Sequence, residues 1–84
     1  MQMSLLKTSI VYSQDQCAAC TAAKYLLHLK GYEVDERKIG AGNKWTKKDL
    51  IDVVPGAKSV PQIFINGEYI GGFNELSAYL NSPK

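Results

Sequence analysis

The pair Asn66-Gly67, which separates the runs Pro61–Ile65 and Glu68–Ile70, constrains the fold more than any other feature of this sequence. Asn-Gly favours the left-handed backbone of a two-residue hairpin turn, so the two flanking runs are predicted to be antiparallel strands. Any fold assigned to the chain must therefore hold a C-terminal hairpin beside the elements that precede it.

Two further strands, with a helix between them, are predicted in the first half of the chain. The strands are Thr8–Tyr12, which is rich in β-branched residues, and Tyr32–Ile39, which follows by a right-handed crossover. The helix is expected to begin near Cys17 and to end at Gly31. Residues at helical spacing predict its apolar face, namely Ala18, Ala22, Tyr25, Leu26 and Leu29. The opposite polar stripe consists of Thr21, Lys24 and His28.

Two more helices complete the predicted order. One starts with Thr46 as its N-cap, because Asp49 three residues later completes a capping pair, and it ends before Pro55-Gly56. Asn74 is the predicted N-cap of the last helix. The resulting order β-α-β-α-β-β-α is typical of an α/β fold. Because 84 residues leave room for one compact core, residues 1–84 are expected to form a single domain.

Charge and hydropathy exclude several classes of protein. Ten basic and eight acidic side chains leave a formal charge of +2, which is too weak and too scattered for a protein whose main partner is nucleic acid. No apolar run approaches the roughly 18 residues of a membrane span, and the first residues lack a signal-peptide pattern. We therefore expect a cytoplasmic protein. Basic residues gather at Lys44, Lys47, Lys48 and Lys58, either as a solvated surface or as an anion-binding group.

The motif that carries chemistry is Cys17-Ala18-Ala19-Cys20, at the junction of the first strand and the first helix. Paired cysteines are rarely structural in the cytoplasm, and a loop this small constrains little of the unfolded chain. Cys17 is expected at the helix N-terminus, where unpaired N–H groups and the helix dipole stabilise a thiolate. Cys20 lies one turn later and can attack a mixed disulfide held on Cys17. The motif therefore predicts that Cys17 is a nucleophile and Cys20 a resolving thiol.

A metal site is the main alternative for the two thiols. A closed zinc site needs about four ligands, whereas the chain offers two cysteines and one histidine. His28 lies about 12 Å beyond Cys20 by helical rise and is expected to face solvent. We therefore expect no metal within one chain, while a cluster shared between two chains stays open at this point.

Three segments, taken in order, make the chain resemble the glutaredoxin family over nearly its whole length. They are the cysteine motif after a strand, Ser59-Val60-Pro61-Gln62-Ile63-Phe64, and Gly71-Gly72-Phe73-Asn74-Glu75-Leu76. The resemblance is to the short dithiol type found in bacteria and phages. It implies the thioredoxin fold, an α/β fold with a four-stranded mixed sheet flanked by three helices, and the predicted order of elements fits it.

The resemblance also implies a binding site for glutathione. It implies a cis peptide bond between Val60 and Pro61, which leaves the Val60 backbone free to pair with the cysteinyl part of glutathione as an added strand would. The γ-glutamyl end is implied to lie on Gly72, Phe73, Asn74 and Glu75, and one of the last two would hold the α-amino group. Structural alternatives stay open, because Pro61 can simply start a strand, the glycines can form only a turn, and Phe73 can belong to the core.

Two departures from the family pattern bear on reactivity. Ala18 and Ala19 replace the Pro-Tyr pair that is common between the cysteines, and this removes a ring that packs on glutathione. Gln14 stands where many relatives have a lysine, and Asp15 adds an anion beside the nucleophile. The Cys17 thiolate is therefore expected to be less stabilised than in lysine-bearing relatives. Lys47, Lys48 or Lys58 can replace the cation that is missing at position 14 and bind the glycyl carboxylate of glutathione.

The activity implied by the resemblance is that of a monomeric, glutathione-dependent oxidoreductase, which reduces protein disulfides and glutathionylated thiols. Ribonucleotide reductase is one protein that such an enzyme can supply with electrons. Two alternatives stay open. The chain can instead be reduced by thioredoxin reductase, although Gly71–Glu75 matches the glutathione type, or it can carry an iron–sulfur cluster in a dimer held by Cys17 and glutathione.

Overall fold

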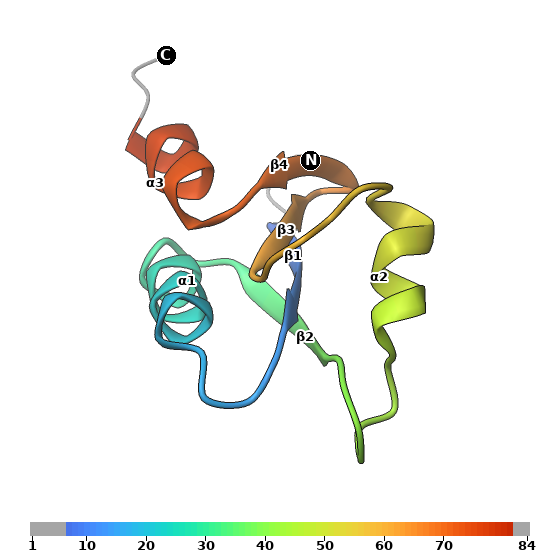
Figure 1. The fold of residues 1–84 in the computed structure, drawn as a ribbon. Coiled ribbons are helices and arrows are strands. Elements are labelled where there is room, and N and C mark those ends of the chain that lie inside the picture. Colours follow the sequence, from blue (N-terminus) through green and yellow to red (C-terminus); the bar gives the residue numbers. More distant parts are fainter. Residues whose placement is uncertain (1–6, 82–84) are drawn as a thin grey trace.

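Residues 7–81 are described in a computed structural model, which confirms the predicted order of elements (Figure 1). The strands are β1 (Thr8–Ser13), β2 (Glu33–Lys38), β3 (Gln62–Ile65) and β4 (Glu68–Gly71). The helices are α1 (Ala18–Leu29), α2 (Lys47–Val53) and α3 (Phe73–Asn81), and none of these described helices is long and apolar enough to cross a membrane. The ends of the predicted single domain, residues 1–6 and 82–84, lie outside the described residues, and so does the N-terminal stretch expected to lack a signal peptide.

The four strands form the expected mixed sheet, in the order β2-β1-β3-β4. β1 pairs in parallel with β2 and antiparallel with β3, and β3 pairs antiparallel with β4. The β3–β4 connection is the predicted turn, with positive φ at both Asn66 and Gly67. The Asn66 side-chain oxygen also accepts a hydrogen bond from the Thr8 N–H (3.1 Å), so the hairpin is tied to the start of β1.

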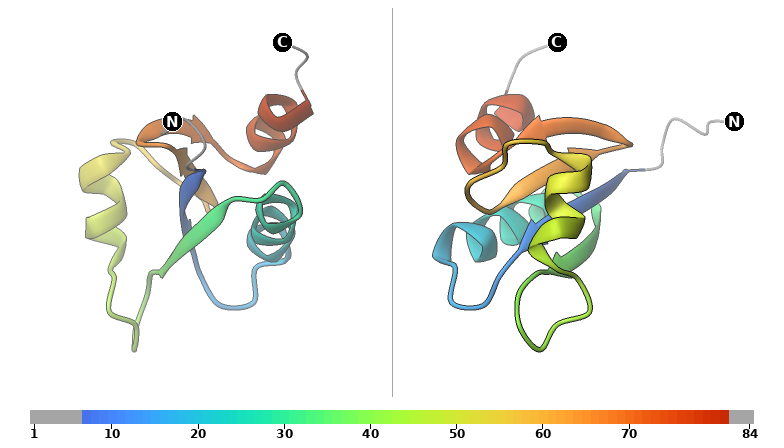
Figure 2. Two further views of the ribbon diagram at one scale, coloured as in Figure 1. Left: turned by 180° about the vertical axis from the view of Figure 1, so that it is seen from behind. Right: turned by 45° about the vertical axis from the view of Figure 1, so that its right-hand side comes forward.

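Helices α1 and α3 cover one face of the sheet and α2 covers the other (Figures 1 and 2). An apolar core lies on each face. Under α1 and α3, the buried residues are Val11, Ala23, Leu27, Ile63, Ile65 and Leu76. Under α2, they are Tyr12, Ile39, Leu50 and Val54. Successive β1 side chains point to opposite faces, which is why Val11 and Tyr12 belong to different cores. Since β1 leads directly into the cysteine-bearing loop, the position of that loop is set by both cores.

The predicted apolar face of α1 is wrong by part of a turn. The buried residues are Cys20, Ala23 and Leu27. Tyr25 and Leu29, by contrast, are 65% and 63% exposed, and Leu26 is the one member of the predicted set that is partly buried. The connection from β1 turns Cys20 toward the sheet, so the inner face consists of the residues three and seven positions after it. Apolar residues occupy both sides of this helix, and periodicity alone did not identify the inner one.

The starts of α2 and α3 differ in how closely they follow the prediction. α2 starts with the predicted capping box, in which Thr46 and Asp49 each bond the other's backbone N–H with a side-chain oxygen. α3 starts earlier than predicted, because the Leu76 N–H bonds to the Gly72 carbonyl, and Gly72 rather than Asn74 is therefore the N-cap. The Glu75 carboxylate accepts a hydrogen bond from the Gly72 N–H (2.9 Å) and so favours this earlier start.

Candidate active site

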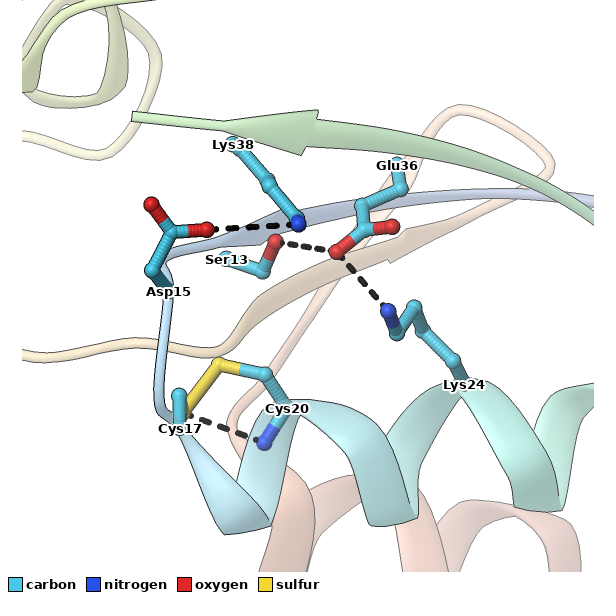
Figure 3. Close-up of polar contacts among 7 residues, drawn as sticks. All are labelled: Ser13, Asp15, Cys17, Cys20, Lys24, Glu36 and Lys38. Atoms are coloured by element: carbon cyan, nitrogen blue, oxygen red, sulfur yellow. Dashed lines mark hydrogen bonds and ion pairs between the residues drawn. A yellow bond between two sulfur atoms is a disulfide. The ribbon is translucent and has the colours of Figure 1, made fainter. Parts of the chain in front are cut away.

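Cys17 and Cys20 lie at the start of α1, joined by a disulfide (Figure 3). Cys17 is the N-cap of the helix, and its sulfur accepts a hydrogen bond from the Cys20 N–H (3.1 Å). Free N–H groups at a helix N-terminus stabilise negative charge on such a sulfur. Cys17 is half-buried, whereas Cys20 is only 2% exposed, so Cys17 is the more accessible of the two cysteines.

A cleft of about 400 Å³ opens on one side of Cys17, between the cysteine loop, α2 and the segment before β3. We call it the α2-side cleft, and its lining includes Gln14, Cys17, Lys47, Lys58, Ser59 and Val60. Lys48, the third lysine expected as an anion partner, is paired with Asp52 on the exposed side of α2 (3.2 Å). The cleft is therefore lined by Cys17 and by two of the three lysines expected to bind an anion.

The segment before β3 gives this cleft a wall of peptide backbone. The Val60–Pro61 bond is cis, as the resemblance implies, and Pro61 is buried while Val60 lines the cleft. Pairing of β3 with β1 starts at Gln62, so Val60 lies before the first paired residue. The Gln62 side chain braces the turn, because its Nε2 donates to the Ser59 carbonyl (2.8 Å) and its Oε1 accepts from the Tyr69 hydroxyl (2.6 Å). An extended peptide can add to a backbone held in this way.

A second hollow, of about 430 Å³, extends from Ser59 to the start of α3. Gly71 and Gly72 line it, and the space around Gly71 explains why that residue is a glycine. Gly71 has a φ of +126°, and a Cβ there would lie 2.9 Å from Cγ of Glu75. At Gly72, a Cβ would lie 3.5 Å from the Pro61 carbonyl oxygen. A side chain at Gly71 would therefore clash with Glu75, whereas a Cβ at Gly72 would make only ordinary van der Waals contacts.

The four residues predicted to receive the γ-glutamyl end are placed differently from one another. Gly72 and Glu75 line the second hollow. Phe73 packs against the core under α1 and α3, and the Asn74 side chain is exposed on the first turn of α3. Of these four residues, Gly72 and Glu75 therefore border the hollow.

Another cavity, of about 410 Å³, lies on the β2 side of the cysteine loop. We call it the β2-side cavity, and its lining includes Asp15, Cys17, Cys20, Lys24, Glu36 and Lys38. Figure 3 shows the charges in two groups: Lys24 donates to Glu36 Oε2 (2.9 Å), and Lys38 pairs with Asp15 (3.2 Å). The Ser13 hydroxyl donates to the same Glu36 oxygen (2.7 Å).

These contacts set the charge state of the cavity. Partial burial alone raises the pKa of Glu36, but hydrogen bonds from Lys24 and Ser13, with the charges of Lys24 and Lys38, hold that pKa below its ordinary value. Glu36 therefore stays a carboxylate at neutral pH. The charge of Asp15, which the sequence places beside the nucleophile, is balanced by Lys38.

Sequence reasoning missed this network. It placed Lys24 on a polar stripe, and the partner Glu36 comes from a separate element. The four-residue spacing from Cys20 to Lys24 was the available signal, because residues at that spacing share one side of a helix. His28 is exposed as expected, and within residues 7–81 no three His, Cys, Asp or Glu side chains gather where they could hold a metal ion.

Comparisons with known proteins point to one family. The glutaredoxin family model matches residues 10–70, which include both cysteines and the Val60–Pro61 bond. Glutaredoxin 1 of Rickettsia conorii is 36% identical over 76 residues, 90% of this chain and 74% of that protein. Glutaredoxin 3 of Escherichia coli is 38% identical over 68 residues, 81% of this chain and 80% of that protein. The crystal structure of glutaredoxin 1 from Francisella tularensis complexed with cacodylate superposes with a TM-score of 0.74 at 28% identity, covering 89% of this chain and 93% of that one.

Proposed function

Because this chain belongs to the glutaredoxin family, we propose that it is a glutathione-dependent oxidoreductase that exchanges thiols and disulfides at Cys17 and Cys20. The observation that carries the proposal is the surface around Cys17, where the α2-side cleft and the second hollow share Ser59. One end of this surface carries cations and the other lies at the start of a helix. Glutathione is a tripeptide with a thiol in its middle and a carboxylate at each end, so its chemistry fits this arrangement.

In the proposed complex, the cysteinyl backbone of glutathione pairs with the backbone of Val60, which directs its sulfur toward Cys17. The glycyl carboxylate binds the ammonium groups of Lys47 and Lys58, both of which line the α2-side cleft. Pro61 and Ser59 shape the wall between the two hollows. The tripeptide thus extends from the lysines, past Cys17, toward the start of α3.

The γ-glutamyl end lies at the N-terminus of α3 in this proposal. Its carboxylate takes the N–H groups of the first turn, starting with those of Phe73 and Asn74, so these two residues contribute backbone rather than side chain. Gly72 lets the ligand approach closely. The α-amino group meets the carboxylate of Glu75, which in the free protein accepts the Gly72 N–H.

The proposed reaction is an exchange of sulfur bonds. The Cys17 thiolate attacks a substrate disulfide, one substrate sulfur becomes bonded to Cys17, and the other leaves as a thiolate. Cys20 then attacks the Cys17 sulfur, which releases the second substrate thiol and forms the Cys17–Cys20 disulfide. Two glutathione molecules reduce this disulfide and leave as glutathione disulfide, so two electrons pass from glutathione to the substrate. A glutathionylated thiol needs Cys17 alone, because a second glutathione removes the one transferred to Cys17.

The proposed substrates are protein disulfides and glutathionylated proteins, with ribonucleotide reductase as a candidate recipient of electrons. The proposed setting is the cytoplasm, whose glutathione pool is reducing. The proposed working form is a monomer in which residues 1–84 make one domain, and no metal takes part.

A coupled assay tests the proposal. A small mixed disulfide is supplied with glutathione, glutathione reductase and NADPH, and a parallel reaction contains thioredoxin reductase instead of the glutathione system. Turnover with glutathione is the expected result. Turnover with thioredoxin reductase alone would overturn the glutathione site while leaving the cysteine chemistry in place. A brown colour after anaerobic purification would point instead to a cluster shared by two chains.

A further inference from the structure

The β2-side cavity has no part in the glutathione pose, yet both cysteines line it. We propose that Lys24 and Glu36 control the resolving step electrostatically. In this proposal the ammonium of Lys24 stabilises the thiolate that Cys20 must form. Glu36 is a positioning residue, which holds that ammonium at the cavity while opposing part of its field. The inference rests on the proposed roles of Cys17 as nucleophile and Cys20 as resolving thiol.

Cys20 needs such help more than Cys17 does. It is only 2% exposed, and burial disfavours the charged form of a thiol. The helix N-terminus stabilises charge on Cys17, its N-cap, whereas Cys20 lies one turn inside the helix and its own N–H bonds to the Cys17 sulfur. A buried thiol that must ionise is helped by a positive charge nearby.

Lys24 is placed to supply that charge. It follows Cys20 by four residues, which is one helical turn or about 6 Å along α1, and both residues line the β2-side cavity. Figure 3 shows the disulfide and the Lys24 side chain on the same side of the helix, facing β2. Because both residues line this partly buried cavity, the positive charge of Lys24 is expected to shift the pH at which Cys20 ionises by about 1 unit.

The ammonium is anchored from two strands. Lys24 donates to Glu36 Oε2 (2.9 Å), and that oxygen also accepts from the hydroxyl of Ser13, which is completely buried. The Lys24 and Glu36 side chains are 27% and 26% exposed, so solvent screens this pair less than it screens a surface pair. Removing Lys24 would leave the carboxylate of Glu36 unbalanced beside Cys20, whereas removing Glu36 would leave the ammonium unopposed.

The remaining charges around the cysteines are also accounted for. Asp15 from the cysteine loop and Lys38 from β2 pair with each other at the same cavity (3.2 Å). Lys47 from α2 and Lys58 from the segment before β3 line the α2-side cleft, beside Cys17. Lys24 is the cation that belongs to the helix of Cys20 and is fixed at the cavity shared by both thiols.

Ellman's reagent isolates the resolving step and needs no glutathione. Reduced Cys17 attacks the reagent and releases one nitrothiobenzoate, with the other left bonded to Cys17. Cys20 then attacks the Cys17 sulfur, the Cys17–Cys20 bond forms, and the second nitrothiobenzoate leaves with the electron pair while the Cys20 proton passes to water. The first release depends on reagent concentration and the second does not, so stopped-flow absorbance separates them at each pH.

The proposal predicts shifts of opposite sign. Lys24→Gln should raise the pH midpoint of the second release by about 1 unit, and Glu36→Gln should lower it. The double variant should return toward the parent, and Lys24→Arg should keep the parent midpoint. Lys30→Gln, at the far end of α1 and outside the lining of the cavity, is the matched control and should leave both releases unchanged.

An unchanged second midpoint in Lys24→Gln would overturn the proposal. So would shifts of the same sign in Lys24→Gln and Glu36→Gln, which are expected if the pair only holds the fold together or if Glu36 takes the Cys20 proton. Thermal unfolding identifies a variant that fails to fold, and Lys24→Met, which keeps the apolar stem, then carries the same prediction. Failure of the glutathione proposal would appear in the coupled assay and would leave this test intact.

Discussion

The two spaces on either side of the cysteine loop are alike in size and differ in how their charges are arranged. In the α2-side cleft, about 400 Å³, the charged lining residues are Lys47 and Lys58. In the β2-side cavity, about 410 Å³, Lys24 and Lys38 are each paired with a carboxylate. Lys47 and Lys58 have no carboxylate beside them in the cleft lining, so they can bind a carboxylate of a ligand. Lys24 and Lys38 are already paired, so in our proposal they act on charges that form within the protein. In our proposal, this difference in charge separates substrate binding from the resolving step.

The largest predicted effect on activity comes from replacing Cys17 or Cys20, which lie between the α2-side cleft and the β2-side cavity. Cys17→Ser should abolish both reduction of protein disulfides and deglutathionylation, because it removes the nucleophile. Cys20→Ser should keep deglutathionylation and lose reduction of protein disulfides, since the first needs one thiol and the second needs two. Both activities are measured by NADPH oxidation in the coupled assay. Equal losses in the two variants would contradict the roles assigned to them.

The next largest effect tests the second hollow, where the γ-glutamyl end of glutathione is proposed to bind. Gly71→Ala should destabilise the fold by about 1–3 kcal/mol, because a Cβ at a φ of +126° would lie 2.9 Å from Glu75. It should also raise the KM for glutathione. Denaturant unfolding and the coupled assay measure the two effects. Gly31→Ala is the matched control, since its φ is also positive but nothing lies within 4 Å of a Cβ there, and its KM should be unchanged.

A smaller effect tests the cations of the α2-side cleft. Replacing both Lys47 and Lys58 with Gln should raise the KM for glutathione by about three- to tenfold, and the increase should shrink as salt is added. The KM is taken from the coupled assay at several salt concentrations. Lys48→Gln is the control, because Lys48 pairs with Asp52 and does not line the cleft. An equal rise in the control would remove the reason to assign the glycyl carboxylate to this cleft.

The smallest effect concerns the stability that the β2-side cavity contributes. The pKa of Glu36 is lowered in the folded state, so its contribution is complete above the unfolded value, about 4.3, and is lost as pH falls through the folded value. Glu36→Gln should therefore lower the free energy of unfolding by about 0.5–1 kcal/mol at pH 7. The difference in free energy of unfolding between Glu36→Gln and the parent should disappear in acid. A gap that stays constant from neutral pH to about pH 3 would show that the carboxylate charge is not responsible.

Local signals in the sequence predicted much of the fold. Asn66-Gly67 identified the hairpin, and Thr46 with Asp49 identified the start of α2, because each depends on residues close together in the chain. Cys17 at the head of α1 followed from the same kind of signal. Features set by a few neighbouring residues can be derived from one sequence.

Features that depend on distant segments were missed. The sequence pattern predicts Tyr25 and Leu29 on the inner face of α1, whereas that face is determined by how the helix packs on the sheet. The pattern predicts Asn74 as the N-cap of α3, whereas the hydrogen bond from the Gly72 N–H to the Glu75 carboxylate favours an earlier start. The Lys24–Glu36 pair joins two elements that the sequence shows only as separate polar positions.

The separation of substrate binding from resolution is tested most directly by attaching glutathione to Cys17 in the Cys20→Ser variant and comparing amide chemical shifts with those of the free protein. The largest changes are expected at Lys58, Val60 and Gly72, along the α2-side cleft and the second hollow. Small changes are expected at Lys24, Glu36 and Lys38. If the largest changes lay in the β2-side cavity, with little change at Val60, glutathione would not bind where we propose.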